Sequence, residues 1–293
     1  MDITLDGLNE TSAAEFAARL GGVFEHAPWI AERAATRRPF ASLAALFEAM
    51  TAVVAEADEA RRLDLLRGHP ELAGAAARSG DMTDHSKAEQ AGAGLAALTA
   101  ERAARFDALN RRHRERFGFP FIVCVKRHGR DSILAEFERR AELSPQAERE
   151  QALAEVSRIA ALRLDALVRG PDRLPVHGRL STHVLDTASG RPAEGVSVEL
   201  LELAADGAHP VATAVTNADG RTDAPLISDR PIPRGGYELR FGLGAYHRAQ
   251  GHALPEPAFL DVVPIRFGVA EPEGRYHVPL VASPWAYSSY RGS

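Results

Sequence analysis

Residues 169–178 read RGPDRLPVHG, and they separate two stretches of sequence with different secondary-structure patterns. The two prolines and two glycines in this segment interrupt helices and strands alike, so we interpret it as a linker. Before it, alanine, leucine, glutamate and arginine predominate, and these residues favour helices. After it, short runs of β-branched and aromatic residues alternate with turn clusters. The sequence therefore predicts a multidomain chain, with an all-α helical domain over 1–168 and an all-β sandwich over 179–293.

Helix boundaries in the first half are marked by local signals. The segment Ser12–Glu15 has the spacing of a capping box, and Ser144–Pro145 is a second helix start, with serine as the N-cap and proline in the first helical position. The segment Gly68–Pro70 follows LDLLR and carries two helix-stopping residues. We expect helices to begin and end at these points.

Strands in the second half are indicated by five short runs. These are THVLD at 182–186, VSVELLEL at 196–203, VATAVT at 211–216, YELRF at 237–241 and YHVPL at 276–280. The stretch 244–250 is the one exception, because its pattern also fits a helix. Runs of this length, separated by turns, favour an antiparallel sandwich.

Composition and charge exclude several classes of function. The chain has 293 residues, of which 45% are hydrophobic and 26% charged, as in soluble globular proteins. A net charge of -5 gives no basis for nucleic-acid binding. No apolar run approaches the roughly 20 residues that span a bilayer, and the N-terminal sequence lacks a signal-peptide pattern. With a single cysteine, Cys124, no intramolecular disulfide can form, and we expect a cytoplasmic protein without a membrane partner.

Three residues of the second half suggest catalysis. His183 and His277 lie in strand-like runs, and Arg221 lies in the turn NADGR. Two imidazoles and a guanidinium can activate a water molecule and bind an anionic heterocycle. Residue types alone leave the other interpretation open, because a strand histidine is more often structural or exposed and a turn arginine is more often solvated.

The motifs LSTHVLD at 180–186, TNADGR at 216–221, GAYHRAQG at 244–251, YHVPL and SPWAYSSYRGS at 283–293 decide between these interpretations. Together they resemble 5-hydroxyisourate hydrolase, the enzyme branch of the transthyretin family. The resemblance implies a tetramer of β-sandwiches with its sites at subunit interfaces. It implies that His183, Arg221 and His277 are catalytic. It also implies that the C-terminal residues line the same site: Tyr290, Arg291, Gly292 and Ser293.

Two further features bear on this resemblance. Transthyretin itself, a hormone carrier, lacks both the histidine of the first motif and the YRGS ending, so their presence here favours an enzyme over a carrier. Cysteine is absent from this half and no tight ligand spacing is visible, so we expect neither a metal nor another cofactor.

Three residues of the first half also suggest a site. His69 follows a helix stop and precedes a proline, so its backbone should be extended and its ring either faces a ligand or is simply exposed. Ser86 and Glu89 have the spacing of a capping box, which would give Glu89 a structural role at a helix N-terminus. That role is compatible with a ligand bound at the same N-terminus. Arg163 falls on the apolar face of the helix after Pro145, where it needs an anionic partner, either a salt bridge or a ligand.

The motifs of the first half include GGVFEHAPWIAERA at 21–34, GHPELAG at 68–74, SKAEQAGAGL at 86–95 and LNRRHRERFGFPFIVCVKR at 109–127. They resemble 2-oxo-4-hydroxy-4-carboxy-5-ureidoimidazoline (OHCU) decarboxylase over about residues 8–168. The resemblance implies an all-helical, cofactor-independent and usually dimeric enzyme in which His69, Glu89 and Arg163 are catalytic. The substrate-binding positions that it implies are Pro70, Ser86, Gln90, Phe119, Phe121, Ile122 and Val123.

The two resemblances support each other, because the product of the hydrolase is the substrate of the decarboxylase. They predict a bifunctional enzyme of urate catabolism, which hydrolyses 5-hydroxyisourate to OHCU and then decarboxylates OHCU to (S)-allantoin. The expected partners are these two small molecules and further copies of the chain. The copies would form a tetramer through the sandwiches, an assembly in which the decarboxylase domains can also pair. Two alternatives stay open: a transthyretin-like binding protein with a helical appendage, and a fusion with only one active domain.

Overall fold

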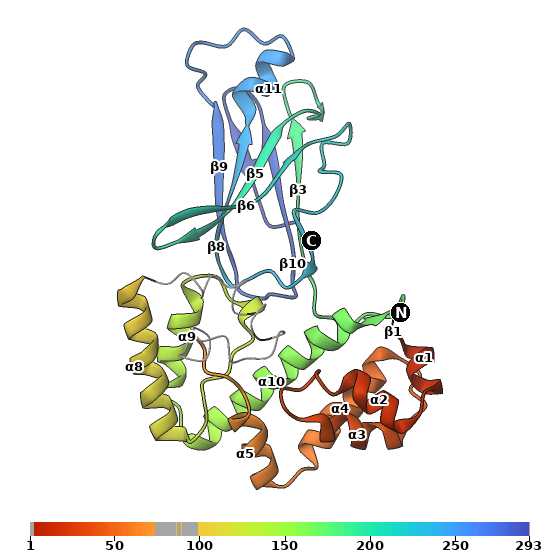
Figure 1. Cartoon of the computed structure of the whole chain (residues 1–293). Helices are drawn as coiled ribbons and strands as arrows, with labels where there is room; N and C mark the ends of the chain where they lie inside the picture. The colour runs from red at the N-terminus through yellow and green to blue at the C-terminus, as the bar shows by residue number, and fades with distance from the viewer. Residues whose placement is uncertain (1–2, 74–85, 87–88, 90–98, 293) are drawn as a thin grey trace. The chain divides into compact units, whose positions relative to one another are not determined.

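The structure is a computed structural model, in which the chain divides into two compact units (Figure 1). It describes all residues except 1–2, 74–85, 87–88, 90–98 and 293. The first unit comprises residues 1–125 and 133–176, and the second comprises 126–132 and 177–293. In the described part of the chain, no helix has the length and apolar character needed to cross a membrane.

The first unit is mostly helical. Its described helices are α1 (Leu5–Glu10), α2 (Ala13–Leu20), α3 (Pro28–Ala34), α4 (Leu43–Ala55), α5 (Glu59–Arg67), α8 (Ala100–Phe117), α9 (Ser132–Arg140) and α10 (Pro145–Leu167), with the 3-10 turn η1 (Ala35–Arg37). A second 3-10 turn, η3 (Val125–Arg127), lies where the chain passes from the first unit to residues 126–132 of the second. Strands β1 (Ile3–Thr4) and β2 (Val168–Arg169) form a short parallel pair that flanks the helices. The unit is therefore mostly helical and not strictly all-α.

The helix boundaries expected from local signals are confirmed. Ser12 caps α2, since its Oγ accepts a hydrogen bond from Glu15 N at 3.2 Å. Ser144 caps α10 in the same way, and Pro145 is the first helical residue. Helix α5 ends at Arg67, and the next residue is its glycine cap. Each of these signals involves residues at most four positions apart, so the helix boundary can be predicted without knowledge of tertiary contacts.

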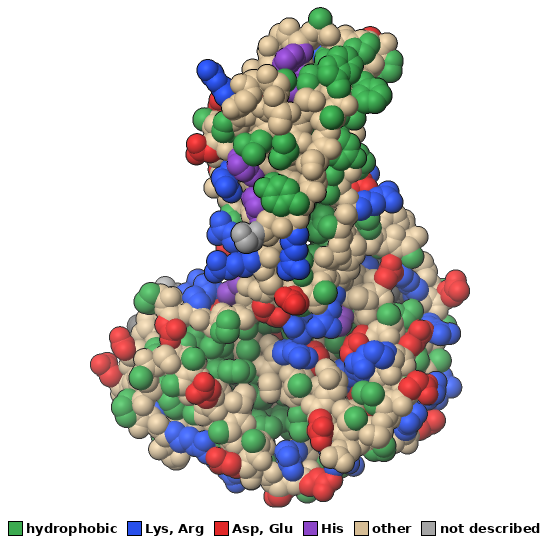
Figure 2. All heavy atoms as spheres, turned by 180° about the vertical axis from the view of Figure 1, so that it is seen from behind, with side chains coloured by type: hydrophobic (Ala, Val, Ile, Leu, Met, Phe, Trp, Pro, Cys, Tyr) green, Lys and Arg blue, Asp and Glu red, His purple; other side chains and the backbone are tan. Residues whose placement is uncertain are grey.

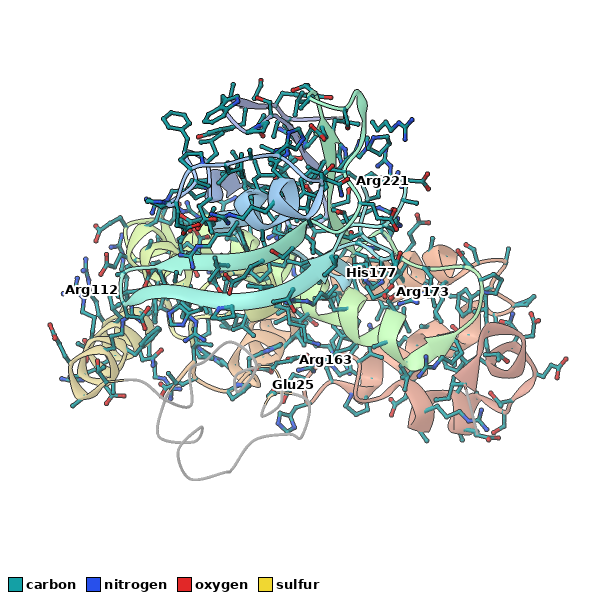
Figure 3. The ribbon with its side chains drawn as sticks, turned by 90° about the horizontal axis from the view of Figure 1, so that it is seen from above. Glu25, Arg112, Arg163, Arg173, His177 and Arg221 are labelled. Atoms are coloured by element: carbon teal, nitrogen blue, oxygen red, sulfur yellow. The ribbon has the colours of Figure 1, made fainter. Side chains whose placement is uncertain are left out.

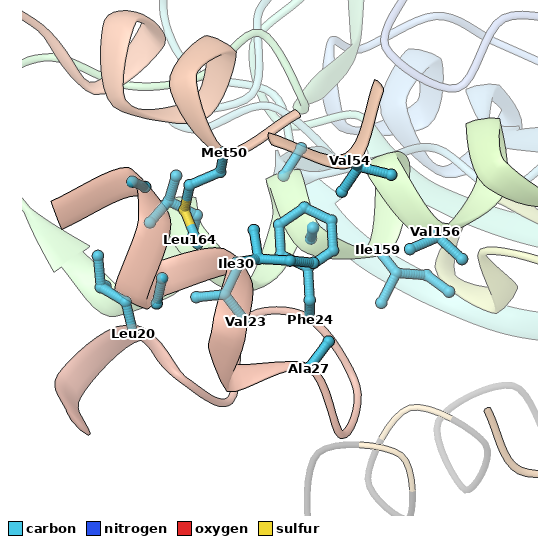
Figure 4. Close-up of a cluster of buried hydrophobic side chains, with 14 of the residues drawn as sticks. Leu20, Val23, Phe24, Ala27, Ile30, Met50, Val54, Val156, Ile159 and Leu164 are labelled. Carbon is cyan, nitrogen blue, oxygen red and sulfur yellow. The ribbon is translucent and has the colours of Figure 1, made fainter. Parts of the chain in front are cut away.

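Two hydrophobic clusters of described residues pack this unit, and Figure 4 shows part of the one that joins the N-terminal helices to α10. Phe24, Ile30 and Met50 come from the region of α2–α4, and Ile159 and Leu164 come from α10; all five are at most 9% exposed. The long helix α10 thus supplies the surface on which the N-terminal helices pack, and Arg163 lies on the same helix.

The segment after α10 continues this packing. Leu174 is 3% exposed and belongs to the same core, and its N–H donates to Asp165 Oδ1 at 2.8 Å. Arg173 pairs with the same carboxylate at 2.6 Å. Residues up to 176 are therefore anchored to the helical unit.

The second unit is a sandwich of two sheets (Figure 1). One sheet has the order β11-β10-β3-β4 with β7 also paired to β3, and the other has the order β6-β5-β8-β9. The strands are β3 (Gly178–Asp186), β4 (Arg191–Pro192), β5 (Ser197–Ala204), β6 (Gly207–Val215), β7 (Ile227–Arg230), β8 (Gly235–Gly242), β9 (Val262–Val269), β10 (Arg275–Ala282) and β11 (Tyr287–Ser289). Helix α11 (Leu243–Ala249) lies between β8 and β9 in sequence, which confirms the helix allowed for 244–250.

The expectation of a fully antiparallel sandwich is wrong at one position. Strands β3 and β10 run parallel, with registered pairs from Arg179↔Arg275 to Asp186↔Ala282. These two strands are separated in sequence by the whole of the other sheet, so no hairpin fixes their relative direction. The parallel register places His277 beside Ser181, two residues before His183 on β3.

A tight turn at 217–221 sits directly against β3. Asn217 Oδ1 accepts from the backbone N–H groups of Asp219 at 3.0 Å and Arg221 at 3.2 Å. Gly220 has φ 71°, and a Cβ there would lie 2.3 Å from Val184 O. Only glycine therefore allows this turn to approach β3 closely enough for Arg221 to form a backbone bridge with His183.

Replacing Gly220 should destabilise the sandwich more than replacing a glycine with the same backbone conformation and open space. At Gly190, φ is 70° and no atom lies within 4 Å of where an added Cβ would be. We therefore expect Gly190→Ala to lower the free energy of unfolding by about 1–2 kcal/mol, from the positive φ alone. In Gly220→Ala the clash with Val184 adds about 1–3 kcal/mol. Urea unfolding followed by circular dichroism measures both losses, and equal losses would contradict the steric argument.

Candidate active sites

Arg163 is the centre of the candidate site in the helical unit. It projects inward from α10 and is 6% exposed. Its Nε and Nη2 donate to the two carboxylate oxygens of Glu89 at 3.1 and 2.9 Å, a two-point contact. Nη1 donates to Glu25 at 2.7 Å, and Figure 3 shows Glu25 beside Arg163. Nη2 also donates to Ser86 Oγ at 3.2 Å. The anionic partner expected for this arginine is therefore present.

His69 lies in the same pocket in its neutral form. Burial lowers its pKa to about 4, and the positive charge of Arg163 lowers it too, whereas Glu25 acts in the opposite direction. The ring is 7% exposed. Among the described residues, Nε2 has no hydrogen-bond partner. A neutral imidazole with one unoccupied nitrogen in a pocket can accept a proton from a ligand.

The pocket itself is small, about 40 Å³. Its lining residues are His69, Pro70, Leu72, Ser86, Glu89, Phe121, Ile122, Val123, Val125, Ile159 and Arg163. The structure thus brings together the three expected catalytic residues and most of the expected substrate-binding positions. Phe119 is not among the lining residues; it is 2% exposed and packs in the hydrophobic core. Gln90 lies outside the described residues, as does part of the segment between Ser86 and Glu89.

Glu25 is a residue of this site that sequence reasoning missed. It is 2% exposed and contacts Arg163 from the segment between α2 and α3. The available signal was a carboxylate that follows two apolar residues, Val23 and Phe24, in a stretch with no helix period. Because a buried carboxylate needs a partner, such a residue could have been matched with the arginine on the apolar face of α10.

A second candidate site lies on the sheet β11-β10-β3-β4. His183 on β3 and His277 on β10 have ring centroids 6.4 Å apart. Ser181, on the same face of β3 as His183, has its Oγ 3.0 Å from His277 Nδ1. This hydrogen bond fixes the orientation of the His277 ring and leaves Nε2 for a ligand. Ser181 was quoted in the motif but not predicted as a site residue, because the parallel register that pairs it with His277 is not visible in sequence.

Both histidines of this site favour the neutral form. The pKa of His183 is lowered by burial and then by the nearby positive charge of Arg221. The pKa of His277 is lowered by burial, by Arg221 and by His183. The structure therefore brings the three expected catalytic residues of this half together, and two imidazoles that are neutral near pH 7 can exchange protons with a water molecule between them.

The C-terminal tail reaches the same site. Gly292 N donates to His277 O at 2.9 Å, and a Cβ at Gly292 would lie 2.6 Å from Cδ2 of that ring. Arg291 stacks over Tyr276 at 5.1 Å, and Tyr290 is 59% exposed. Ser293 lies outside the described residues. The tail thus contacts a candidate catalytic histidine through a residue that has to be small.

Comparison with known families agrees with this division into two sites. Residues 9–165 match the family model described as OHCU decarboxylase, and residues 180–292 match that of the HIUase/transthyretin family, where HIUase is 5-hydroxyisourate hydrolase. The chain belongs to both families, fused in one polypeptide. The two resemblances drawn from the sequence motifs are therefore confirmed.

Individual relatives cover each part and the whole. The chain is 53% identical over 116 residues to 5-hydroxyisourate hydrolase 2 of Rhizobium meliloti, spanning 40% of this chain and 97% of that protein. It is 43% identical over 163 residues to the OHCU decarboxylase of Haloferax volcanii, spanning 56% and 95%. A crystal structure of (S)-allantoin synthase is 33% identical and covers 99% of this chain and 100% of its own, with a TM-score of 0.54.

Substituting Gly292 tests whether the tail positions His277. In Gly292→Ala the added methyl group has to displace the imidazole, and a displacement of about 1 Å lowers the rate of a positioned reaction on the order of 100-fold. We expect this loss in the consumption of 5-hydroxyisourate, together with a changed NMR signal of the His277 ring. Gly268→Ala, where no atom lies within 4 Å, is the control. If both variants keep the wild-type rate, the tail does not position the ring.

Proposed function

We propose that this chain is a bifunctional enzyme of urate catabolism, in which residues 179–293 hydrolyse 5-hydroxyisourate to OHCU and residues 1–168 decarboxylate OHCU to (S)-allantoin, with 169–178 as the connecting segment. The observation that supports this most is the end-to-end similarity with (S)-allantoin synthase. The two clusters of candidate catalytic residues, one in each unit, are the second support.

Hydrolysis would use the two neutral histidines as proton carriers. Ring centroids 6.4 Å apart leave room for a water molecule hydrogen-bonded to both imidazoles. One histidine takes a proton as the water oxygen bonds to the ring carbonyl carbon of 5-hydroxyisourate. The carbon–nitrogen bond then breaks, and the proton taken from water passes, directly or through the other ring, to the leaving nitrogen. The new carboxylic acid releases its proton to solvent, so both histidines end neutral and the product carries a carboxylate. Arg221, whose charge acts on both rings, stabilises the negative charge on the carbonyl oxygen.

Decarboxylation would rely on His69 for proton transfer. The substrate loses its carboxylate as CO₂, and the electron pair of the broken carbon–carbon bond forms a double bond to the neighbouring ring carbon, which carries the ureido group. The electron pair of the former carbon–nitrogen double bond moves to nitrogen, which takes a proton from solvent. A proton is then delivered to the ureido-bearing carbon as the hydroxyl group becomes the carbonyl group of allantoin. A neutral His69 takes the hydroxyl proton of OHCU and returns a proton to one face of the ureido-bearing carbon, which sets the configuration of the product. Its low pKa keeps the ring available as a base from about pH 5 upward.

The charges around Arg163 favour loss of CO₂. Glu25 and Glu89 both contact this one guanidinium. The carboxylate of OHCU would be a third acidic group in the pocket, and loss of CO₂ moves its negative charge from that carboxylate onto the ring. The negative charge that remains is delocalised over the ring, where Arg163 and the side chain of Glu89 that it holds can orient the ureido and hydroxyl groups.

Self-association of the sandwich is supported by its exposed apolar side chains. Within the described residues, the exposed large hydrophobic side chains are Val215, Phe259, Val262, Trp285, Tyr287 and Tyr290, all in the second unit. On the face drawn in Figure 2, hydrophobic groups and histidines of this unit lie near one another. Exposed large hydrophobic side chains gathered on one unit, among them the neighbouring rings of Phe259 and Trp285, are typical of an interface. We therefore propose that the chain forms a tetramer through its sandwiches. We also propose that it acts in the cytoplasm, a reducing compartment in which its single buried cysteine stays a free thiol.

Sedimentation equilibrium of the full chain tests the assembly. We expect a mass of at least four chains, because each sandwich would bury its exposed aromatic side chains against its neighbours. If the chain is a monomer at micromolar concentration and still hydrolyses 5-hydroxyisourate at the full rate, a tetramer is not needed to form the hydrolase site.

Single histidine variants test the two activities. Freshly prepared 5-hydroxyisourate is mixed with the full chain, and ultraviolet absorbance and circular dichroism are followed together. Wild type should give optically active allantoin faster than spontaneous decay. His183→Ala should slow the first step about 10²–10⁴-fold, and His69→Ala should slow the second by a similar factor and accumulate OHCU.

The control for this experiment is His209→Ala, because His209 is a partly exposed histidine paired with Asp206 outside both sites. If wild type is no faster than the spontaneous reactions, the chain is a binding protein. If one step alone is accelerated, only one domain is active.

A further inference from the structure

A third cluster of titratable side chains lies apart from both candidate active sites. Asp186 is the last residue of β3, His247 lies in α11, and His252 follows that helix. Each contributes one potential ligand atom, and these atoms lie within 4.8 Å of one another. Asp186 and His183 are three residues apart on one strand, so their side chains point to opposite faces of the sheet. The cluster therefore faces away from the candidate hydrolase site.

His247 is the unusual member of this cluster. It is 1% exposed, and neither ring nitrogen has a hydrogen-bond partner among the described residues. Leaving a buried polar atom without a hydrogen bond is unfavourable, and here two such atoms belong to one ring. Its neighbours are the rings of Tyr246 and His252, with centroids 4.9 and 5.2 Å away. Burial lowers the pKa of His247, so the ring is neutral and its lone pair is available to a ligand.

Asp186 is held as an oriented carboxylate. It is 3% exposed, and burial raises its pKa, but hydrogen bonds from Ser189, Ala188 and Tyr246 outweigh burial and lower it overall. Ala188 N donates to Oδ1 at 2.8 Å, and the Tyr246 hydroxyl donates to Oδ2 at 3.2 Å. Hydrogen bonds of this kind orient the carboxylate ligands of bound metals.

We propose that Asp186, His247 and His252 form a binding site for a zinc-type divalent cation. Two imidazoles and one carboxylate are a ligand set that Zn²⁺ accepts, with a water molecule as fourth ligand. Bonds of about 2.1 Å in a tetrahedron place ligand atoms about 3.4 Å apart, so side-chain shifts of roughly 1 Å complete the site. His252 is partly exposed, which gives the cation a route from solvent.

The bound cation would act as a structural clamp. It connects α11 and the segment after it to the end of β3, the strand that also carries His183. It coordinates one of the two His247 ring nitrogens that have no partner among the described residues. This site is independent of the proposed reactions, and its test does not use activity.

Zinc titration of the metal-stripped full chain, in competition with a chromophoric chelator, tests the site. We expect His252→Ala and His247→Phe each to weaken one zinc site per chain about tenfold or more. His209→Ala should keep wild-type affinity, since this histidine also lies beside a carboxylate but outside the cluster. His183→Ala should also keep wild-type zinc affinity, because His183 is not one of the proposed ligands. This variant is included because it would lose zinc binding if the hydrolase histidines formed the zinc site instead.

Three outcomes would each overturn the proposal: wild type binds no zinc, His252→Ala binds zinc with unchanged affinity, or His183→Ala abolishes zinc binding. Thermal unfolding gives a second readout. Zinc should raise the unfolding temperature of wild type and His209→Ala but not that of His252→Ala. Circular dichroism of the metal-free variants shows whether they fold. If His247→Phe does not fold, His252→Ala still tests the site, because His252 is partly exposed and its replacement disturbs the fold less.

Discussion

The parallel pairing of β3 with β10 determines where the functional side chains of the sandwich lie. It places Ser181 beside His277 and brings the rings of His183 and His277 to 6.4 Å. The turn that carries Arg221 can approach β3 only because Gly220 has no side chain. The tail residue Gly292 then closes against the ring of His277 from the other side of β10. A shift of β10 by one residue against β3 would turn His277 to the face opposite His183, so the whole site depends on this register.

The helical unit depends on a different constraint, the burial of a positive charge. Arg163 leaves the apolar face of α10, and a charge in that position is tolerated only with good partners. Glu89, Glu25 and Ser86 supply four hydrogen bonds from segments far apart in the chain. The same charge helps to keep His69 neutral. One ion-pair network therefore both ties the unit together and sets the protonation of its candidate base.

The sequence predicted those features that rest on local signals. Helix starts at Ser12 and Ser144 depend on neighbours within four residues, and they lie where expected. Features that depend on distant contacts were missed: the parallel direction of β3 and β10, the contact of Glu25 with Arg163, and the approach of His247 to a carboxylate 61 positions earlier. The candidate catalytic residues were found because family motifs carry long-range information that residue types and spacing lack.

The ring nitrogens of the buried histidines distinguish three roles. His113 is fully buried, and both its nitrogens are occupied, by Phe119 O at 3.1 Å and by Glu148 at 3.0 Å, so it can only hold structure. His69 leaves one nitrogen without a described partner and faces a pocket, as a proton carrier must. His247 leaves both nitrogens without described partners and faces two potential ligands instead of a pocket. Because an unsatisfied buried nitrogen is costly, its persistence points to a ligand, and its surroundings indicate which: a substrate where there is a cavity, and a cation where there is a second imidazole and a carboxylate.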